Sequence, residues 1–257
     1  MHGNALAARA SSSLEQRDTA FGVLAVVERG RMRYLSYGPE FGVVYQSVID
    51  LDRPHELQAP YMRLMMLGMV YTRPDARTVH IGVGAGNMAG YLIRHFPGAT
   101  VDAVDIDPHA VELGRRWFGL TPDPRLAVHI DDGRRWLERN AGPFDVVFLD
   151  AYDDKSIPPA LMDRGFFALV ASRLAPGGVA MQNVYLPIVE RGVLLDAMGA
   201  AFDHIDVYRT RSSAVLAAYR GEAREVALLS ARAQSLEALL LLPHPLSEQL
   251  ALRVQGL

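Results

Sequence analysis

The chain has 257 residues, 50% of them hydrophobic, and its 26 basic and 29 acidic side chains leave a net charge of −3. This length supports one domain with a small appendage, and the nearly balanced charge excludes a chain-wide basic surface that would attract nucleic acid or an anionic membrane. The sequence has no cysteine, which excludes disulfides, thiolate catalysis and cysteine-bound metal, and which fits a cytoplasmic protein.

The first part of the chain contains a leader and a small β region. Residues 1–20 lack the basic start and the sustained apolar core of a secretory signal, so we expect a flexible leader there. Over residues 21–56, three stretches with alternating apolar and polar positions begin at Val23, Met32 and Val43, and glycine-containing turns separate them. This pattern predicts a small antiparallel β meander.

Residues 57–257 are predicted to form a Rossmann-like, nucleoside-binding catalytic domain. The spacing of Leu, Tyr and Met side chains over residues 57–70 suits a buried helix. From Thr78 onward, strands alternate with helices, which is typical of right-handed crossovers in a parallel sheet. The expected strands are 78–82, 100–105, 126–130, 144–150, 178–183, 204–210 and 213–219, and a helical tail follows from residue 231. The sequence therefore predicts an α/β fold with a doubly wound, mostly parallel, seven-stranded sheet.

Membranes and metals are not expected as partners. No apolar run in the sequence approaches the roughly 20 residues that a membrane-spanning helix needs. The eight histidines show no spacing typical of metal ligands. A small-molecule partner is easier to accommodate than either.

A glycine-rich loop follows the first strand of the predicted parallel sheet. Its glycines are Gly82, Gly84 and Gly86, and a helix begins near Asn87. Glycines allow the backbone to approach a ligand closely, and the start of a helix offers unpaired amides. Asp105 ends the next strand, about 20 residues further on, where an acid can bind ribose hydroxyls. Because dinucleotides and sulfonium nucleosides both use such loops, the pattern predicts nucleoside binding without choosing between them.

Three more acids follow the third and fourth strands. Asp132, directly before Gly133, either accepts a hydrogen bond from the amine of adenine or caps the following helix. Asp150 and Asp153 stand where an apolar strand ends, and parallel strands deliver such ends to the ligand crevice. A pair of carboxylates can bind an ammonium group and then take its proton, one acid having its pKa raised by the other. Tyr152, between them, either covers a substrate or packs its own loop.

Taken in order, these motifs resemble the spermidine synthase family, whose members are aminopropyltransferases on the class I S-adenosylmethionine-dependent methyltransferase fold. The resemblance covers roughly residues 22–220. It implies homodimers and a co-substrate that is decarboxylated or ordinary S-adenosylmethionine. The implied co-substrate residues are Gln46, Gly82, Gly84, Gly86, Asp105, Asp132 and Gly133. Asp150 is the implied catalytic base, and the residues expected to hold an amine acceptor such as putrescine are Asp153, Tyr61 and Tyr152.

One departure from the family pattern leaves other functions open. The loop has Ala85 where the family usually has an aspartate that contacts the amine of the decarboxylated donor and repels the carboxylate of the ordinary one. Two like charges about 5 Å apart, at an effective dielectric near 20, repel by roughly 3 kcal/mol. Without that repulsion, a methyltransferase is an alternative, although the Asp150 and Asp153 pair argues against it. A dehydrogenase is weaker, because Asn87 stands at the usual third glycine position, and a noncatalytic nucleoside-binding relative is a further alternative.

Overall fold

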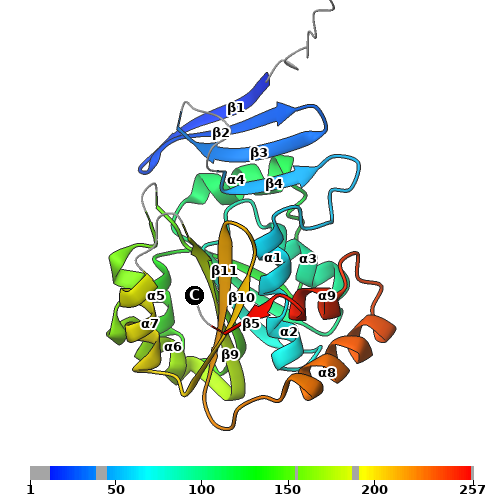
Figure 1. Ribbon diagram of the computed structural model, residues 1–257. Coiled ribbons are helices and arrows are strands. Elements are labelled where there is room, and N and C mark those ends of the chain that lie inside the picture. The colour runs from blue at the N-terminus through cyan, green and yellow to red at the C-terminus, as the bar shows by residue number, and fades with distance from the viewer. Residues whose placement is uncertain (1–11, 39–44, 154–155, 187–190, 256–257) are drawn as a thin grey trace, which may run out of the picture.

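The computed structural model describes residues 12–38, 45–153, 156–186 and 191–255, which form two β-sheets and the helices around them (Figure 1). In this described part, the smaller sheet is antiparallel and contains β1 (Ser12–Thr19), β2 (Gly22–Arg29), β3 (Met32–Tyr37) and β4 (Ser47–Asp50), in that order. It is the predicted meander with one additional strand, β1. The start of the third predicted stretch, residues 43–44, lies outside the described residues.

Strand β1 occupies part of the predicted leader. It pairs with β2 as an antiparallel hairpin. Thr19 closes the turn, since its Oγ1 donates to the Gly22 carbonyl at 2.9 Å and accepts from the Phe21 amide at 3.0 Å. The expectation of a flexible chain is therefore wrong for residues 12–19, because hairpin pairing with the next strand orders them. Residues 1–11 lie outside the described part of the chain.

The larger sheet, as far as the structure describes it, has eight strands in the order β12-β10-β11-β9-β8-β5-β6-β7. Strands β5 to β9 run parallel to one another, and β10, β11 and β12 join as antiparallel strands. The bounds are β5 (Arg77–Ile81), β6 (Thr100–Asp105), β7 (Leu126–Ile130), β8 (Phe144–Leu149), β9 (Leu174–Tyr185), β10 (His204–Arg209), β11 (Ser213–Tyr219) and β12 (Arg253–Val254). The predicted α/β class and mostly parallel sheet are confirmed, and the two-residue β12 adds an edge to the seven expected strands.

Helices cover both faces of this sheet (Figure 1). On one face, a hydrophobic core is shared by α1 (Pro60–Met65), α2 (Gly68–Tyr71), α3 (Asn87–His95), α8 (Val226–Leu239) and α9 (Leu246–Leu250). On the other, a second core is shared by α5 (Gly133–Arg139), α6 (Arg164–Arg173), which follows the short 3₁₀ helix η1 (Pro159–Leu161), and α7 (Arg191–Gly199). The expected doubly wound arrangement is therefore present.

The helix expected over residues 57–70 is divided into α1 and α2. Between them the chain tightens, and Met69 donates to the Met66 carbonyl at 3.1 Å, which is the shorter hydrogen bond of a 3₁₀ turn. Helix α2 begins at Gly68, where a Cβ would stand 2.8 Å from Val146 Cγ1 on β8. The close approach of this segment to the sheet accompanies the break, and the spacing of apolar residues gave no sign of it.

A third core joins the N-terminal sheet to the larger one. Its buried side chains come from β2, β3 and β4, from helix α4 (Pro108–Trp117) and the residue after it, and from the glycine-rich loop: Leu24, Val26, Leu35, Ile49, Ala110, Leu113, Phe118 and Ala85. This packing places the start of β4 beside the loop. The small sheet therefore forms one wall of the candidate site.

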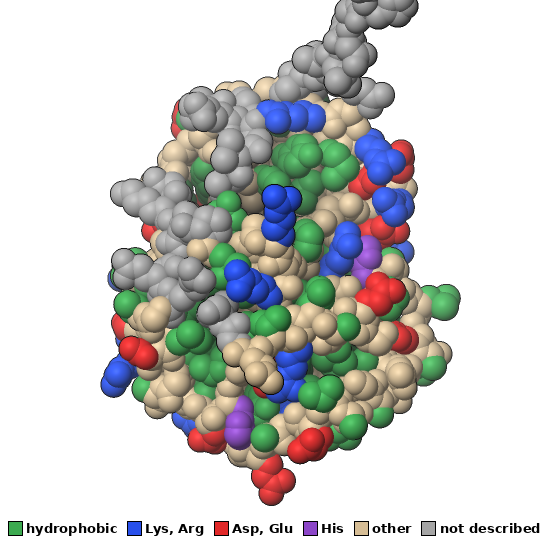
Figure 2. Space-filling model, in the orientation of Figure 1, with side chains coloured by type: hydrophobic (Ala, Val, Ile, Leu, Met, Phe, Trp, Pro, Cys, Tyr) green, Lys and Arg blue, Asp and Glu red, His purple; other side chains and the backbone are tan. Residues whose placement is uncertain are grey.

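The surface agrees with the balanced charge of the sequence. On the face shown in Figure 2, Lys and Arg side chains are scattered among hydrophobic and uncharged groups. Among the helices that the structure describes, none has both the length and the apolar character to cross a membrane.

Candidate active site

The glycine-rich loop after β5 adopts a conformation that favours glycine. Gly82, Gly84 and Gly86 have φ values of 87°, 55° and 84°, in the left-handed region where a side chain is strained. A Cβ on Gly82 would stand 2.6 Å from the backbone nitrogen of Ala151, and one on Gly84 would stand 2.9 Å from Ser47 Oγ. The loop is therefore enclosed between the end of β8 and the N-terminal sheet.

Residues at the start of β4 hold the loop from its other side. Ser47 Oγ accepts a hydrogen bond from the Ala85 amide at 3.0 Å, and Asn87 Nδ2 donates to the Val48 carbonyl at 3.2 Å. Gln46 also lies against the loop, with its carbonyl oxygen 3.5 Å from where a Cβ on the second glycine would stand. The structure thus brings the predicted residue Gln46 to the glycines, and its contact with a co-substrate stays a prediction.

Asp105, at the end of β6, is buried and binds main-chain amides. Its Oδ2 accepts from Val83 at 2.7 Å and Gly84 at 2.8 Å, and its Oδ1 accepts from Asp107 at 2.9 Å. Burial raises the pKa of Asp105, although the three amides act in the opposite direction. Asp105 therefore reaches the loop as its position in the sequence predicts, and in the structure it fixes the loop's shape.

Asp132 and Gly133, at the start of α5, both have structural roles. Asp132 Oδ1 accepts from the Arg135 amide at 2.9 Å, so this acid caps the helix. A Cβ on Gly133 would stand 2.3 Å from Ile81 Cγ2, so this glycine lets α5 lie close to β5. The helix-capping alternative is confirmed for Asp132, and contact of either residue with an adenine ring stays a prediction.

Asp150 follows β8 and receives hydrogen bonds from two side chains. Its main-chain nitrogen donates to the Ile81 carbonyl at 2.9 Å, which fixes the backbone. Asn183 Nδ2 donates to Oδ1 at 2.7 Å, and the Tyr61 hydroxyl donates to Oδ2 at 3.2 Å. Burial raises the pKa of Asp150 to about 7, while the two donors lower it. Near neutral pH this carboxyl can therefore exist in both protonation states.

The cause of that raised pKa differs from the expectation. The sequence interpretation attributed it to repulsion between two neighbouring acids, whereas burial is the largest cause in the structure. Asp153 is exposed, and its Oδ1 accepts from the Ser156 amide at 2.7 Å while its own amide donates to the Ser156 carbonyl at 3.0 Å. Asp153 is therefore bonded to Ser156 through both its side chain and its main chain, and its role as an amine anchor stays a prediction.

The two tyrosines assigned to the substrate have different surroundings. The Tyr61 hydroxyl meets Asp150, and burial together with that carboxylate raises the pKa of Tyr61 well above its ordinary value. Tyr61 is therefore a neutral hydrogen-bond donor at the site. The Tyr152 hydroxyl donates to the Asn183 carbonyl at 3.1 Å and accepts from the Tyr185 amide at 2.7 Å. Of the two interpretations of Tyr152, the structure supports packing of its own loop.

Asn183 is the site residue that the sequence interpretation missed. It lies on β9 and is 5% exposed. Strands β8 and β9 are parallel, with Leu149 opposite Gln182. Asp150 directly follows Leu149 and Asn183 directly follows Gln182, so the two side chains come together. A polar residue at the end of an apolar strand was the available signal, but its value depended on knowing that these two strands are neighbours.

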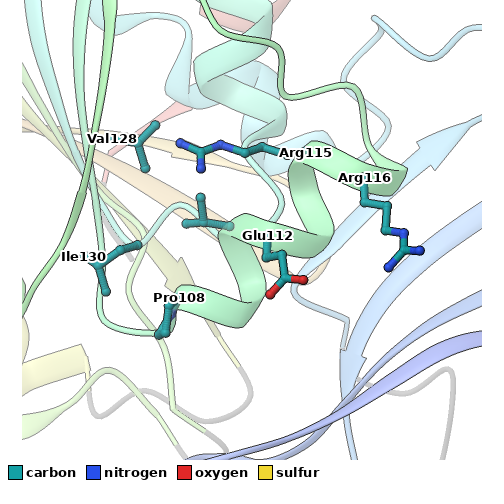
Figure 3. A pocket seen from close by; sticks show the side chains of 7 residues that line it. Pro108, Glu112, Arg115, Arg116, Val128 and Ile130 are labelled. Atoms are coloured by element: carbon teal, nitrogen blue, oxygen red, sulfur yellow. The ribbon is translucent and has the colours of Figure 1, made fainter.

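A surface groove of about 470 Å³ borders this end of the sheet (Figure 3). It lies between α4 and β7, and its lining residues are Pro108, Val111, Glu112, Arg115, Arg116, Val128 and Ile130. Figure 3 shows Arg115 reaching toward Val128 across the groove. None of the predicted site residues lines it, so the groove neighbours the candidate site without being part of it.

Sequence comparison gives a family match over more than half of the chain. Residues 61–208 match the family model described as the spermine/spermidine synthase domain. A polyamine aminopropyltransferase of Vibrio vulnificus is 26% identical over 179 residues, and one of Chromobacterium violaceum is 30% identical over 159 residues. The matches cover 68% and 62% of this chain and 60% of each relative, so the chain spans about 60% of the length of these relatives.

Methyltransferases also appear among similar proteins. The human eEF1A lysine and N-terminal methyltransferase is 34% identical over 117 residues, covering 40% of this chain and 17% of that protein. The crystal structure of human methyltransferase-like protein 13 in complex with SAH has a TM-score of 0.65 at 26% identity, covering 72% of this chain and 94% of the other. A probable spermidine synthase from Corynebacterium glutamicum has a TM-score of 0.71 at 22% identity over 86% of each chain, which supports the fold alone.

Proposed function

Because the chain belongs to the spermine/spermidine synthase family, we propose that it transfers an aminopropyl group from decarboxylated S-adenosylmethionine to an amine acceptor such as putrescine. The single observation that carries this proposal is the environment of Asp150. Its carboxyl is held by Tyr61 and Asn183 at the end of β8, and burial raises its pKa to about 7. The curated polyamine aminopropyltransferases with similar sequences support the same activity.

Asp150 would act as the base that makes the amine nucleophilic. An alkylamine with a pKa near 10 is almost wholly protonated at pH 7, and removing its proton costs about 4 kcal/mol. Ionised Asp150 binds the ammonium group and takes that proton. The nitrogen lone pair then attacks the methylene carbon on sulfur, so that a C–N bond forms, the C–S bond breaks, and its electron pair leaves with a neutral thioether. The protein's main contribution beyond the base is to hold amine and methylene in line.

The glycine-rich loop and the acids around it would bind the nucleoside of the donor. A carboxylate offers about four lone-pair positions, and Asp105 uses three for the amides of the loop and of its own turn. The remaining position on Oδ1 is the one we assign to a ribose hydroxyl. Asp132, which caps α5 through Oδ1, would use its other oxygen for the amine of adenine. Gln46 would line the same pocket from the N-terminal sheet.

A methyltransferase using ordinary S-adenosylmethionine is the second candidate. It is favoured by Ala85, whose side chain is buried in the apolar core between the loop and the N-terminal sheet. The loop therefore presents no carboxylate at this position to repel the carboxylate of the ordinary donor. The similar sequence of the human eEF1A lysine and N-terminal methyltransferase supports this candidate.

Calorimetric binding of the two donors separates these candidates. We expect tighter binding of decarboxylated S-adenosylmethionine and, with putrescine present, formation of spermidine detected by mass spectrometry. Tighter binding of the ordinary donor, or a methylated amine as the product, would overturn aminopropyl transfer. Binding of neither donor would overturn both enzymatic candidates.

The variant Asp150→Asn tests the base. Loss of general-base catalysis is expected to lower turnover by about 10²- to 10⁴-fold, with donor affinity unchanged. Asp145→Asn is the matched control, because Asp145 lies on β8, the strand that Asp150 follows, and its Oδ2 accepts from the Arg77 amide at 2.8 Å. Turnover by Asp150→Asn at the parent rate would contradict the assignment.

A further inference from the structure

Among the described residues, Asn183 donates the shortest side-chain hydrogen bond to Asp150. The distance from Asn183 Nδ2 to Asp150 Oδ1 is 2.7 Å, compared with 3.2 Å from the Tyr61 hydroxyl to Oδ2. A hydrogen bond to an ionised carboxylate is both shorter and stronger than one between neutral groups. Asn183 is therefore the side chain with the greater influence on the charged form of Asp150.

The backbone of Asn183 is held on both sides. Asn183 pairs with Val215 of the neighbouring antiparallel strand β11. Its carbonyl accepts from the Tyr152 hydroxyl at 3.1 Å and from Gln182 Nε2 at 2.8 Å. With the main chain fixed in this way, the direction of the amide side chain depends on few torsions. The donor therefore reaches Asp150 from a rigid part of the sheet.

The other half of the Asn183 amide contributes no hydrogen bond to the fold. Its Oδ1 is buried and has no hydrogen-bond partner among the described residues. A buried polar atom without a partner is unfavourable, so packing alone would favour an apolar side chain of similar size here. Among the described residues, the contact with Asp150 is the one hydrogen bond of this side chain that can offset that penalty.

We propose that Asn183 is a positioning residue, which orients the Asp150 carboxyl and stabilises its ionised form. Its value for catalysis rests on the proposed function, since an ionised Asp150 is the form that takes a proton from the amine. The hydrogen bond itself does not depend on that function. The two ideas can therefore fail separately.

The proposal is tested by titrating Asp150 in the protein without substrates. The carboxyl carbons of aspartate are labelled with ¹³C, and the Asp150 signal is assigned from its absence in Asp150→Asn. In Asn183→Leu we expect the titration midpoint to rise by about one to two pH units, because a hydrogen bond to a charged group is lost. In Asn183→Asp, which has nearly the same shape and keeps the strand packing, the rise should be larger, because a like charge is added.

A remote variant and a kinetic profile exclude a merely structural role. Asn140→Ala removes the amide whose Nδ2 donates to the Trp136 carbonyl at the end of α5, and it should leave the Asp150 midpoint unchanged. In the two Asn183 variants, the acid limb of the pH–rate profile should move with the titration midpoint. A midpoint equal to that of the parent in either variant would overturn the proposal. If transfer is absent in the parent, the titration still decides the role of Asn183.

Discussion

Asp105 and Asp150 stand at strand ends on either side of β5, but their partners differ in kind. Asp105 accepts three main-chain amides from the loop and from its own turn. Asp150 accepts from two side chains, one on α1 and one on β9. Side chains can be exchanged by single substitutions, whereas main-chain amides cannot. The comparison teaches that the Asp105 side of the site, which we propose binds the nucleoside, is held by main-chain amides, while the protonation of Asp150 can be changed by single substitutions.

The largest expected effect is on the pH dependence of stability at Asp150. Burial raises its pKa from 3.8 to about 7 in the folded protein, so the folded state holds the proton more tightly than the unfolded state. This contribution to stability is fully present below pH 3.8 and is lost as pH rises through about 7. A shift of about three units corresponds to at most about 4 kcal/mol, and the partial exposure of Asp150 reduces that figure.

The variant Asp150→Asn should remove this pH dependence. Urea unfolding at pH 5 and at pH 8.5 measures it, and the stability of the variant relative to the parent should increase at the higher pH. Asp145→Asn, on the strand that Asp150 follows, serves as the control. Parallel pH–stability curves for the parent and Asp150→Asn would contradict the raised pKa and with it the contrast between the two acids.

The variant Asp105→Ala addresses the other side of the comparison. It leaves amides of Val83, Gly84 and Asp107 without their acceptor, so the loop should lose its fixed shape. We expect stability to fall by about 2–3 kcal/mol and donor affinity to fall by about 10- to 100-fold. Calorimetry with the donor measures the affinity.

Asp102→Ala is the control for that variant. Asp102 lies on β6 as well, but it contacts His129 Nε2 at 2.9 Å and is not bonded to the loop in the described contacts. Its removal should change donor affinity much less than Asp105→Ala does. Equal donor affinity in Asp105→Ala and the parent would show that the loop keeps its shape without this acid.

The smallest expected effect comes from Tyr152→Phe. The variant loses the hydroxyl that joins the Asn183 carbonyl to the Tyr185 amide, and we expect stability to fall by about 1–2 kcal/mol. If Tyr152 only packs its loop, the KM for the amine stays near the parent value. Tyr185→Phe is the control, since Tyr185 contributes its main-chain amide to the contact. A large rise in KM with unchanged stability would instead favour the predicted contact with substrate.

Local patterns in the sequence predicted much of the fold. Strands β6 and β7 have the expected bounds, Thr100–Asp105 and Leu126–Ile130, because alternating strands and helices have distinct patterns of apolar residues. The single helix over residues 57–70 was wrong, since the chain divides into α1 and α2 where Gly68 lies close to the sheet. The leader was wrong over residues 12–19, where pairing with β2 orders the chain. The domain boundary at residue 57, the homodimer and the cytoplasmic location remain predictions.

The sequence by itself determined the α/β class, the glycine turn and the acids at the strand ends. These features depend on residues close together in the chain, so their patterns are visible without a structure. Only the tertiary structure placed Tyr61 and Asn183 on Asp150, from 89 and 33 residues away. It also assigned the raised pKa of Asp150 to burial. Both depend on which strands and helices become neighbours and on how much water their packing excludes, and no local pattern records either.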